Sequence, residues 1–521
     1  MCILTPRKHS LLPVLTASMF ALFSHSAASA QSLIPGDLLV SRSTYEGTAT
    51  TVTVGQALPG GGTAVADGSS LNVFNNEAPD PSFGITSSIL LDQFNTSSNS
   101  VDNTINITQL AANQGINLTT SFPSKSELAL NVSTDGKAVT FMGYEAPKNT
   151  LDVSNSNTPG HVDATNPVTS TYQRAVGQLN LDGTLSVTAV NAYSGNNGRA
   201  AVSAGGNYYM VGNAGNGSGT EPTNIVNNTG VQTTAVGGSA DTTVVGQQLG
   251  TPGAANGFQY GYAATPADKS GKDDNFRGLT VFNNTLYSTK GSGSNGVNTV
   301  YQVGSTGTLN SLAANASSTS ISILPGFNTV AAKTATGGPN PFGLFFANAS
   351  TLYVADEGNG KTGASAAADA FAGLEKWVNS KADGTGTWSL AYTLANGLNI
   401  GQSYSLTGVS GSVTTQTGGL RNIAGQVNGN SVTLYAITST TGSTLTDAGA
   451  DPNKLVAITD SLNSLTGTGE SFMTLETAAY GDVLRGVSLT AIPEPATYGV
   501  VVGLAVLGFA AWRRKTTGSH V

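Results

Sequence analysis

The sequence is poor in cysteine, histidine and charge. It contains one cysteine, Cys2, and four histidines among its 521 residues. Charged residues make up 10% of the chain, against about 25% in an ordinary soluble domain. A single cysteine excludes an internal disulfide, and so few cysteines and histidines exclude an ordinary zinc site. The net charge of −8 disfavours binding to nucleic acid, because neutralising phosphates needs clustered lysine and arginine.

Common catalytic signatures are missing as well. The chain has no G-x-S-x-G, no H-E-x-x-H and no Walker phosphate loop. Any Ser-His-Asp triad outside the two terminal segments would have to use His161, which stands in a stretch rich in proline and asparagine that is typical of an exposed loop. These absences weigh against an enzyme without excluding one.

The N-terminus has the three parts of a secretory signal peptide. Arg7 and Lys8 form a basic start, residues 11–23 are mainly apolar, and Ala28 and Ala30 supply the small residues of a cleavage site. We therefore expect signal peptidase to remove residues 1–30, and Cys2 with them. An exported chain without cysteine has to be held together by the burial of its core alone.

The C-terminus carries a second targeting pattern. An apolar run over residues 496–512 is preceded by Pro493, Glu494 and Pro495 and followed by Arg513 and Arg514. As a helix this run would span about 25 Å, near the short end of what crosses a bilayer. It predicts one transmembrane helix with its basic end on the cytoplasmic side.

This order of motif, apolar run and basic end resembles the PEP-CTERM sorting signal of Gram-negative bacteria. The resemblance covers residues 491–521 and leaves 31–490 as the exported domain. It implies that exosortase recognises the signal in an inner-membrane-anchored precursor and removes the tail. It also implies delivery to the outer surface or the extracellular matrix. An ordinary C-terminal membrane anchor is the alternative.

The middle of the chain has the pattern of many short antiparallel strands. Short β-branched or aromatic runs alternate with Gly, Asn and Ser. Asp-Gly pairs at 135–136, 182–183 and 383–384 stand between apolar runs, as tight hairpin turns do. The Ala-rich stretch 364–377 is the exception and predicts a short helix within a loop.

The strands recur in a longer frame. Comparable units begin at Arg199, Arg277, Phe342, Arg421 and Arg485, separated by 78, 65, 79 and 64 residues. Each unit has room for four strands and long loops, which predicts an all-β fold, a β-propeller. A parallel β-helix and a pair of β-sandwiches are the alternatives.

The last unit is cut short, and this predicts how the ring closes. Residues 484–490 supply one strand of a blade whose other strands come from the N-terminal segments 36–40 and 87–94. Sharing one blade between the chain ends removes exposed sheet edges. This shared blade and the units that start near residues 127, 199, 277, 342 and 421 make six blades, or seven if residues 228–272 contain another.

The repeated arginine is the main candidate site. Arg199, Arg277, Arg421 and Arg485 each begin the first strand of a unit, which lines the channel of a propeller. One interpretation is an anion-binding site, because the guanidinium fork matches carboxylates. The other is structural, with each arginine bonded to carbonyl groups or to an acid such as Glu127. Repetition in nearly every blade favours the structural interpretation.

Acidic residues offer a second candidate site. Asp356 and Glu357 directly follow a predicted strand and could ligate Ca²⁺, whose flexible shell of oxygens suits loops. Turn formation by Asp and Asn explains the same pattern and is the simpler interpretation. No other cofactor is indicated.

These patterns favour a structural or binding protein of the cell surface or the exopolysaccharide matrix of a biofilm, with a glycan as the partner. The alternative is a Ca²⁺-dependent propeller hydrolase or lyase that acts on an anionic polymer or a phosphoester.

Overall fold

The computed structural model describes residues 32–47, 52–57, 63–64, 67, 85–151, 153, 172–193, 196–213, 230–246, 273–293, 295–406, 414–441 and 449–490. Several predictions lie outside these residues: the cleavage site (Ala28, Ala30), the His161 loop, and the sorting segment 491–521 with its transmembrane helix, Pro493, Glu494, Pro495, Arg513 and Arg514. None of the described helices combines the length and the apolar character that crossing a bilayer demands.

The described chain is almost entirely β-sheet, as predicted. Its helices are short: α1 (Ile107–Ala112), α2 (Leu309–Leu312), α3 (Gly363–Ala367) and the 3₁₀ turn η1 (Ala316–Ser318). The strands of the first half are β1 (Leu38–Thr44), β2 (Thr86–Asn95), β3 (Ser100–Asn106), β4 (Leu118–Ser121), β5 (Asn131–Val132), β6 (Ala138–Glu145), β7 (Arg174–Asn180), β8 (Leu185–Val190), β9 (Gly198–Ala204), β10 (Asn207–Gly212), β11 (Gly230–Ala235) and β12 (Thr243–Val245). The second half adds β13 (Leu279–Phe282), β14 (Thr285–Lys290), β15 (Thr299–Val303), β16 (Ile321–Ile323), β17 (Pro341–Asn348), β18 (Thr351–Asp356), β19 (Gly373–Asn379), β20 (Trp388–Leu394), β21 (Ser403–Ser405), β22 (Thr414–Asn428), β23 (Ser431–Thr441), β24 (Lys454–Ser461), β25 (Met473–Thr477) and β26 (Asp482–Leu489).

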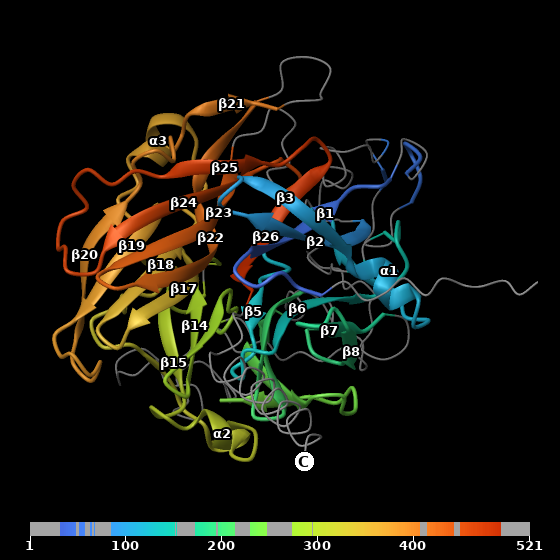
Figure 1. Cartoon of the computed structure of the whole chain (residues 1–521), viewed down its shortest axis with the longest axis horizontal. Helices are drawn as coiled ribbons and strands as arrows, with labels where there is room; N and C mark the ends of the chain where they lie inside the picture. The colour runs from blue at the N-terminus through green and yellow to red at the C-terminus, as the bar shows by residue number, and fades with distance from the viewer. Residues whose placement is uncertain are drawn as a thin grey trace, which may run out of the picture.

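Antiparallel pairing groups the described strands into sheets that form a propeller-like ring (Figure 1). Four sheets are separate units: β9–β12, β13–β16, β17–β20 and β21–β25. In a larger sheet, β4 joins the strands β26, β1, β2 and β3 to the strands β5–β8. Each sheet buries its apolar faces against the sheets before and after it in the ring. Every sheet therefore needs a similar pattern of strands, which explains the repeat in the sequence.

The innermost strands contact one another in cyclic order, β26 to β5, then β9, β13, β17, β22 and back to β26. The approach is close enough to require glycine. A Cβ atom on Gly343 of β17 would lie 2.6 Å from the carbonyl oxygen of Arg421 in β22. Gly278, next to Arg277, lies equally tightly against the carbonyl of Phe342. Glycine therefore follows Arg277 and Phe342, because a side chain there would collide with a carbonyl of the neighbouring strand.

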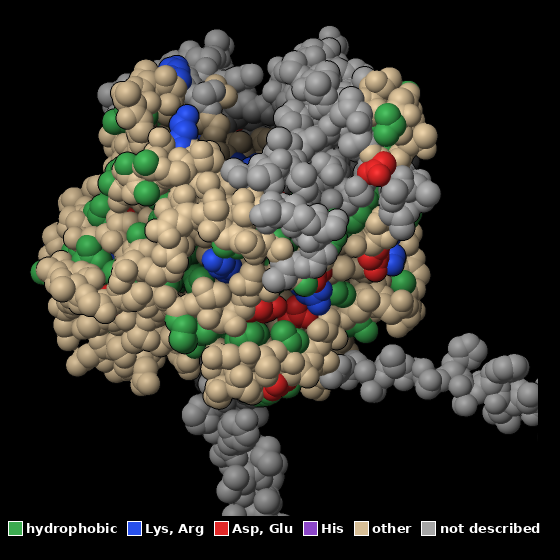
Figure 2. Space-filling view, turned by 90° about the horizontal axis from the view of Figure 1, so that it is seen from above, with side chains coloured by type: hydrophobic (Ala, Val, Ile, Leu, Met, Phe, Trp, Pro, Cys, Tyr) green, Lys and Arg blue, Asp and Glu red, His purple; other side chains and the backbone are tan. Residues whose placement is uncertain are grey.

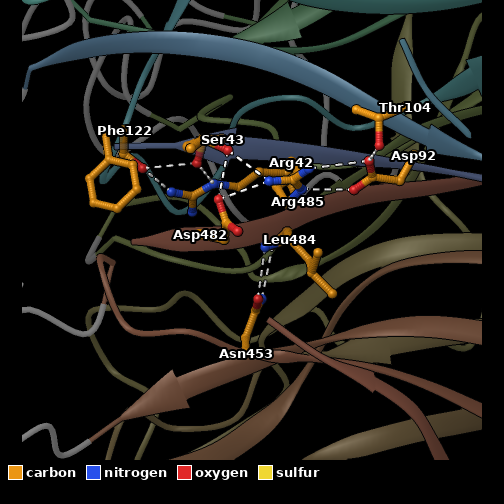
Figure 3. Close-up of polar contacts among 10 residues, drawn as sticks. Arg42, Ser43, Asp92, Thr104, Phe122, Asn453, Asp482, Leu484 and Arg485 are labelled. Atoms are coloured by element: carbon orange, nitrogen blue, oxygen red, sulfur yellow. Dashed lines mark hydrogen bonds and ion pairs between the residues drawn. The ribbon is translucent and has the colours of Figure 1, made fainter. Parts of the chain in front are cut away.

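The predicted pairing of the chain ends is present. β26 lies antiparallel to β1, with Leu489 opposite Leu38 and Asp482 opposite Thr44. Arg42 of β1 bridges its neighbours, because its guanidinium pairs with Asp92 at 2.7 Å and with Asp482 at 2.9 Å (Figure 3). This pairing leaves β26 without an open edge toward β1.

The core lies between sheets, and alternate residues of one strand serve different interfaces. In β18, Leu352 and Val354 pack toward the β13–β16 sheet, whereas Tyr353 and Ala355 pack toward the β22 sheet. All four side chains are fully buried. A strand with two apolar faces is what stacking of blades requires, and it replaces the disulfides that the sequence lacks.

Two details differ from the sequence predictions or refine them. The helix expected over 364–377 is wrong beyond its first turn, because α3 ends at Ala367 and residues 373–379 form β19. Pairing of β19 with both β18 and β20 outweighs the helix propensity of alanine. Residues 230–245 of the stretch that could hold a seventh blade are β11 and β12, the outer strands of the β9 sheet.

Candidate functional site

The four repeated arginines divide into two groups. Arg199, Arg421 and Arg485 lie in the innermost strands β9, β22 and β26, and Arg277 lies two residues before β13. Two of the side chains bond groups in the seams between sheets, and two line a pocket between the innermost strands.

Arg199 and Arg485 are buried and bond neighbouring segments of the ring. Arg485, 2% exposed, donates to the carbonyl oxygens of Phe122 and Gly449 and to Ser43 (Figure 3). Arg199 donates to the carbonyl oxygen of Phe276 at 2.7 Å. Burial, and then the charge of Arg277, lower the pKa of Arg199 well below its usual range. Both side chains connect one sheet to another.

Arg277 and Arg421 line a pocket of about 390 Å³ together with Lys125 and Glu357. The four residues come from separate parts of the ring: the segment before β5, the approach to β13, the end of β18, and β22. We call this hollow the axial pocket. Three cationic side chains and one carboxylate give it an excess of positive charge.

The partners of Arg277 are neutral. Its two terminal nitrogens donate to the hydroxyl groups of Ser126 and Ser292, and its Nε, the guanidinium nitrogen bonded to Cδ, is buried without a hydrogen-bond partner. Burial lowers the pKa of Arg277, and the charge of Arg421 adds to this effect while Glu357 opposes it. Arg277 is thus a half-buried cation without its own carboxylate at hydrogen-bond distance.

Glu357 is the anion of the axial pocket. Its Oε2 lies 3.2 Å from Nε of Arg421. Burial alone would raise the pKa of Glu357, but the charges of Arg277, Arg421 and Lys125 outweigh it and lower the pKa below its usual value. Glu357 therefore balances one of the three positive charges, and the axial pocket keeps a net positive charge.

Asp356 and Glu357, the predicted calcium ligands, face different partners. The buried carboxylate of Asp356 accepts backbone N–H groups of Gly358, at 2.8 Å, and of Asn340. Burial raises the pKa of Asp356 to about 7, with contributions from Asp369 and Glu357. Across the described residues, no group of three or more His, Cys, Asp or Glu side chains is placed to hold a metal. Calcium binding stays a prediction.

Sequence reasoning missed Lys125, because nothing marks a single lysine in an irregular segment. It named Glu127 as a partner for arginine, whereas Glu127 accepts hydrogen bonds from the hydroxyl groups of Tyr144 and Thr120. Arg277 contacts the neighbouring Ser126 instead. Lys125 and Ser126 directly precede the repeat unit that starts near residue 127. A search of the loops next to the start of each unit would have found them.

Comparison with known proteins identifies the end of the chain. The family model described as the PEP-CTERM protein-sorting motif matches residues 491–515. This motif indicates an exported protein that is made as a membrane-anchored precursor, processed by exosortase and delivered to the surface. No curated protein matches the chain.

Two solved structures show distant similarity. The N-terminal domain of Nup159 is 8% identical, with a TM-score of 0.26, over 70% of this chain and 90% of that one. A glycosyl hydrolase from Bacteroides ovatus is 11% identical, with a TM-score of 0.25, over 61% of this chain and 82% of that one. At these scores neither similarity bears on function.

Proposed function

We propose that this chain is a binding protein of the cell surface and the extracellular polysaccharide matrix, and that its axial pocket binds an acidic glycan. The observation that carries the proposal is the imbalance of charge in that pocket, where the charged groups among the described lining residues are Lys125, Arg277, Arg421 and Glu357. A uronate carboxylate or a sulfate group fits a half-buried guanidinium that has neutral partners.

The rest of the molecule supports binding through hydrogen bonds. Uncharged polar groups and backbone dominate the face in Figure 2, and few charged side chains interrupt them. Such a surface suits the neutral hydroxyl groups of a polysaccharide, while one charged pocket adds selectivity.

We further infer a ring of six blades. The larger sheet divides at β4, a strand of four residues that pairs with two residues of β2 and two of β6. On either side of β4 stand four strands, β26 with β1–β3, and β5–β8. The cyclic contacts of the innermost strands support the same count.

The test is a glycan array probed with the full-length chain in mild detergent, with and without Ca²⁺. Acidic glycans should bind, and binding should weaken as salt rises. Lys125→Gln should weaken binding several-fold, whereas Lys381→Gln, which replaces an exposed lysine on the β19–β20 turn, should not. Equal binding by both variants would refute the axial pocket as the site. Turnover of a polyuronide or a phosphoester would instead favour the hydrolase or lyase.

A further inference from the structure

A larger cleft adjoins the axial pocket. It has a volume of about 1010 Å³ and lies between the start of β15, the segment 327–341, the segment 359–371 and β19. Four of its lining residues also line the axial pocket, namely Asn298, Ala332, Asn340 and Asn359. A ligand that occupies one hollow can therefore extend into the other. We call the larger one the Glu375 cleft.

Glu375 is the most unusual side chain of this cleft. It lies in β19 and is 1% exposed. Its Oε2 accepts the indole N–H of Trp377 at 2.6 Å, while its Oε1 is buried and has no hydrogen-bond partner. A buried acceptor without a partner is costly, and native proteins rarely keep one without a reason.

Asp369 presents a second oxygen of the same kind. Its Oδ1 accepts the backbone N–H of Phe371 at 3.1 Å, and its Oδ2 is buried without a partner. Asp369 and Glu375 come from different segments, yet both line the cleft. Two unpartnered carboxylate oxygens at one hollow are complementary to a donor-rich, positively charged ligand.

The electrostatics of the cleft agree with such a ligand. Burial raises the pKa of Glu375 well above its usual range, and the charges of Asp356 and Asp369 add to this effect. Asp356 is close because the strand register places Val354 opposite Glu375 and Gly373 opposite Asp356, so the two acids are diagonal neighbours on one sheet face. Lys361, which is exposed, is the charged group of opposite sign among the described lining residues.

The wall of the cleft favours an organic cation over a bare metal ion. The rings of Phe327 and Trp377 stack with centroids 3.9 Å apart, and Phe371 also lines the cleft. Aromatic surface attracts an ammonium group and packs against its carbon frame. Ca²⁺ instead takes six to eight oxygen ligands.

We propose that the Glu375 cleft binds a primary ammonium group, such as the amine of an amino sugar, between the carboxylates of Glu375 and Asp369. With the proposed function, on which this extension rests, the axial pocket takes an anionic group and the neighbouring cleft takes a cationic one. The two sites together then select a zwitterionic glycan.

The decisive experiment is calorimetric titration of the full-length chain with a glucosamine oligomer and with the N-acetylated oligomer of the same length. The amine should bind at least about tenfold more tightly, the usual effect of one charge-assisted hydrogen bond. Glu375→Gln should remove this preference. Glu476→Gln is the matched control. Glu476, on strand β25, is only partly buried, but it also has a carboxylate oxygen without a hydrogen-bond partner.

Each other outcome has a definite meaning. Equal affinity for the two oligomers, or an unchanged preference in Glu375→Gln, would overturn the ammonium site. Competition by Ca²⁺ that Glu375→Gln abolishes would overturn it in favour of a metal site. Acidic glycans serve as the internal reference: if Glu375→Gln still binds them, a negative result refutes the cleft and leaves the axial pocket intact.

A second readout uses pH. The hexylammonium ion keeps its charge across neutral pH, because an alkylamine titrates near 10.4 as lysine does. Its affinity for the wild-type protein should fall as pH is lowered through the raised pKa of Glu375, because the carboxylate then gains a proton, while hexanol should show no such change. The same fall in Glu375→Gln, or no fall in the wild type, would contradict the proposal.

Discussion

The side-chain amide of Asn422 donates a hydrogen bond to the carbonyl oxygen of Arg485, 2.7 Å away. This bond joins β22 to β26 and so connects the last complete sheet to the strand that closes the ring. Asn453 fastens β26 a second time, because its amide group bonds both the N–H and the carbonyl of Leu484 at 2.9 Å (Figure 3). Two asparagine side chains thus bond backbone groups of β26, as the backbone of a neighbouring strand would.

Replacing Asn422 with Leu should destabilise the ring. The variant leaves a buried carbonyl without its donor, which costs about 1–3 kcal/mol. Chemical denaturation of the full-length chain measures this loss. Asn428→Ala, at the exposed end of the same strand, should change the free energy of unfolding very little. Equal stability of both variants would show that the bond is dispensable.

Removing the closing strand should have a larger effect. A chain that stops at Gly481 loses β26 and leaves β1 with an open edge, whereas a chain that stops at Ala491 keeps it. Leu484 and Val487 also leave the core, at about 1.5–3 kcal/mol each. We expect the shorter chain to aggregate and the longer one to melt cooperatively. Indistinguishable melting curves would rule out closure by β26.

Substitutions in the two groups of arginines should have different effects, one on stability and the other on glycan affinity. Arg485→Gln should lower the melting temperature, because the buried carbonyls of Phe122 and Gly449 lose their donor. Arg277→Gln should reduce the affinity for acidic glycans more than it reduces stability, since the partners it leaves are hydroxyl groups. Calorimetry on both variants gives the two quantities. A reversed pattern would place the ligand site at Arg485.

Stability should also depend on pH through Glu375. Because burial raises its pKa, the folded protein holds this proton more tightly than the unfolded chain does. The free energy of unfolding is therefore greatest below the ordinary pKa, about 4.3, and falls as pH rises from there toward the raised value. Glu375→Gln keeps an acceptor for Trp377 and avoids the buried charge. The melting temperature of Glu375→Gln should be higher than that of the wild type at pH 8 and equal to it at pH 4.

The exposed Asp182 provides a control of opposite sign. Hydrogen bonds from Thr184 lower the pKa of Asp182. The stabilisation from these bonds is present at neutral pH and is lost as pH falls through the lowered pKa. Asp182→Asn should therefore melt below the wild type at pH 8. If both variants shifted in the same direction at pH 8, the assignment of the Glu375 effect to ionisation would fail.

Sorting can be tested separately from folding. Replacing Pro493 and Pro495 with Ala should leave the precursor unprocessed in the inner membrane, since these residues belong to the matched sorting motif. Fractionation of cells followed by blotting distinguishes the precursor from the surface form. Normal delivery of the double variant would mean that another part of the chain directs sorting.

Much of the fold was predictable because its signals are local. The Asp-Gly turns predicted at 135–136, 182–183 and 383–384 all occur between paired strands, and each glycine has the positive φ that a tight turn needs. The closing strand was predictable because a repeat unit was cut short. The helix expected over 364–377 failed, because the partners of β19 are distant in the sequence.

The candidate sites were harder to predict for a related reason. Repetition marked Arg277 and Arg421, but it marked Arg199 and Arg485 equally, and only three-dimensional contacts distinguish a ligand residue from a tie between sheets. Glu375 lay within the stretch expected to be helical, so its burial was not foreseen. Whether a carboxylate lacks a partner depends on residues far away in the chain, and a single sequence does not reveal this.

The position of β26 also has a mechanical consequence. The strand ends at Leu489, and the sorting motif matches from residue 491 onward. Tension applied at this end of the described chain reaches β26 before any other strand. A pull along the strand axis loads all the backbone hydrogen bonds between β26 and β1 at the same time, because the two strands are paired over their full lengths. The bonds therefore resist together instead of breaking in sequence. The side chains of Arg42, in β1, and Asn453, just before β24, also bond β26 and carry part of this load. The strand that closes the ring is therefore also the part that resists mechanical unfolding.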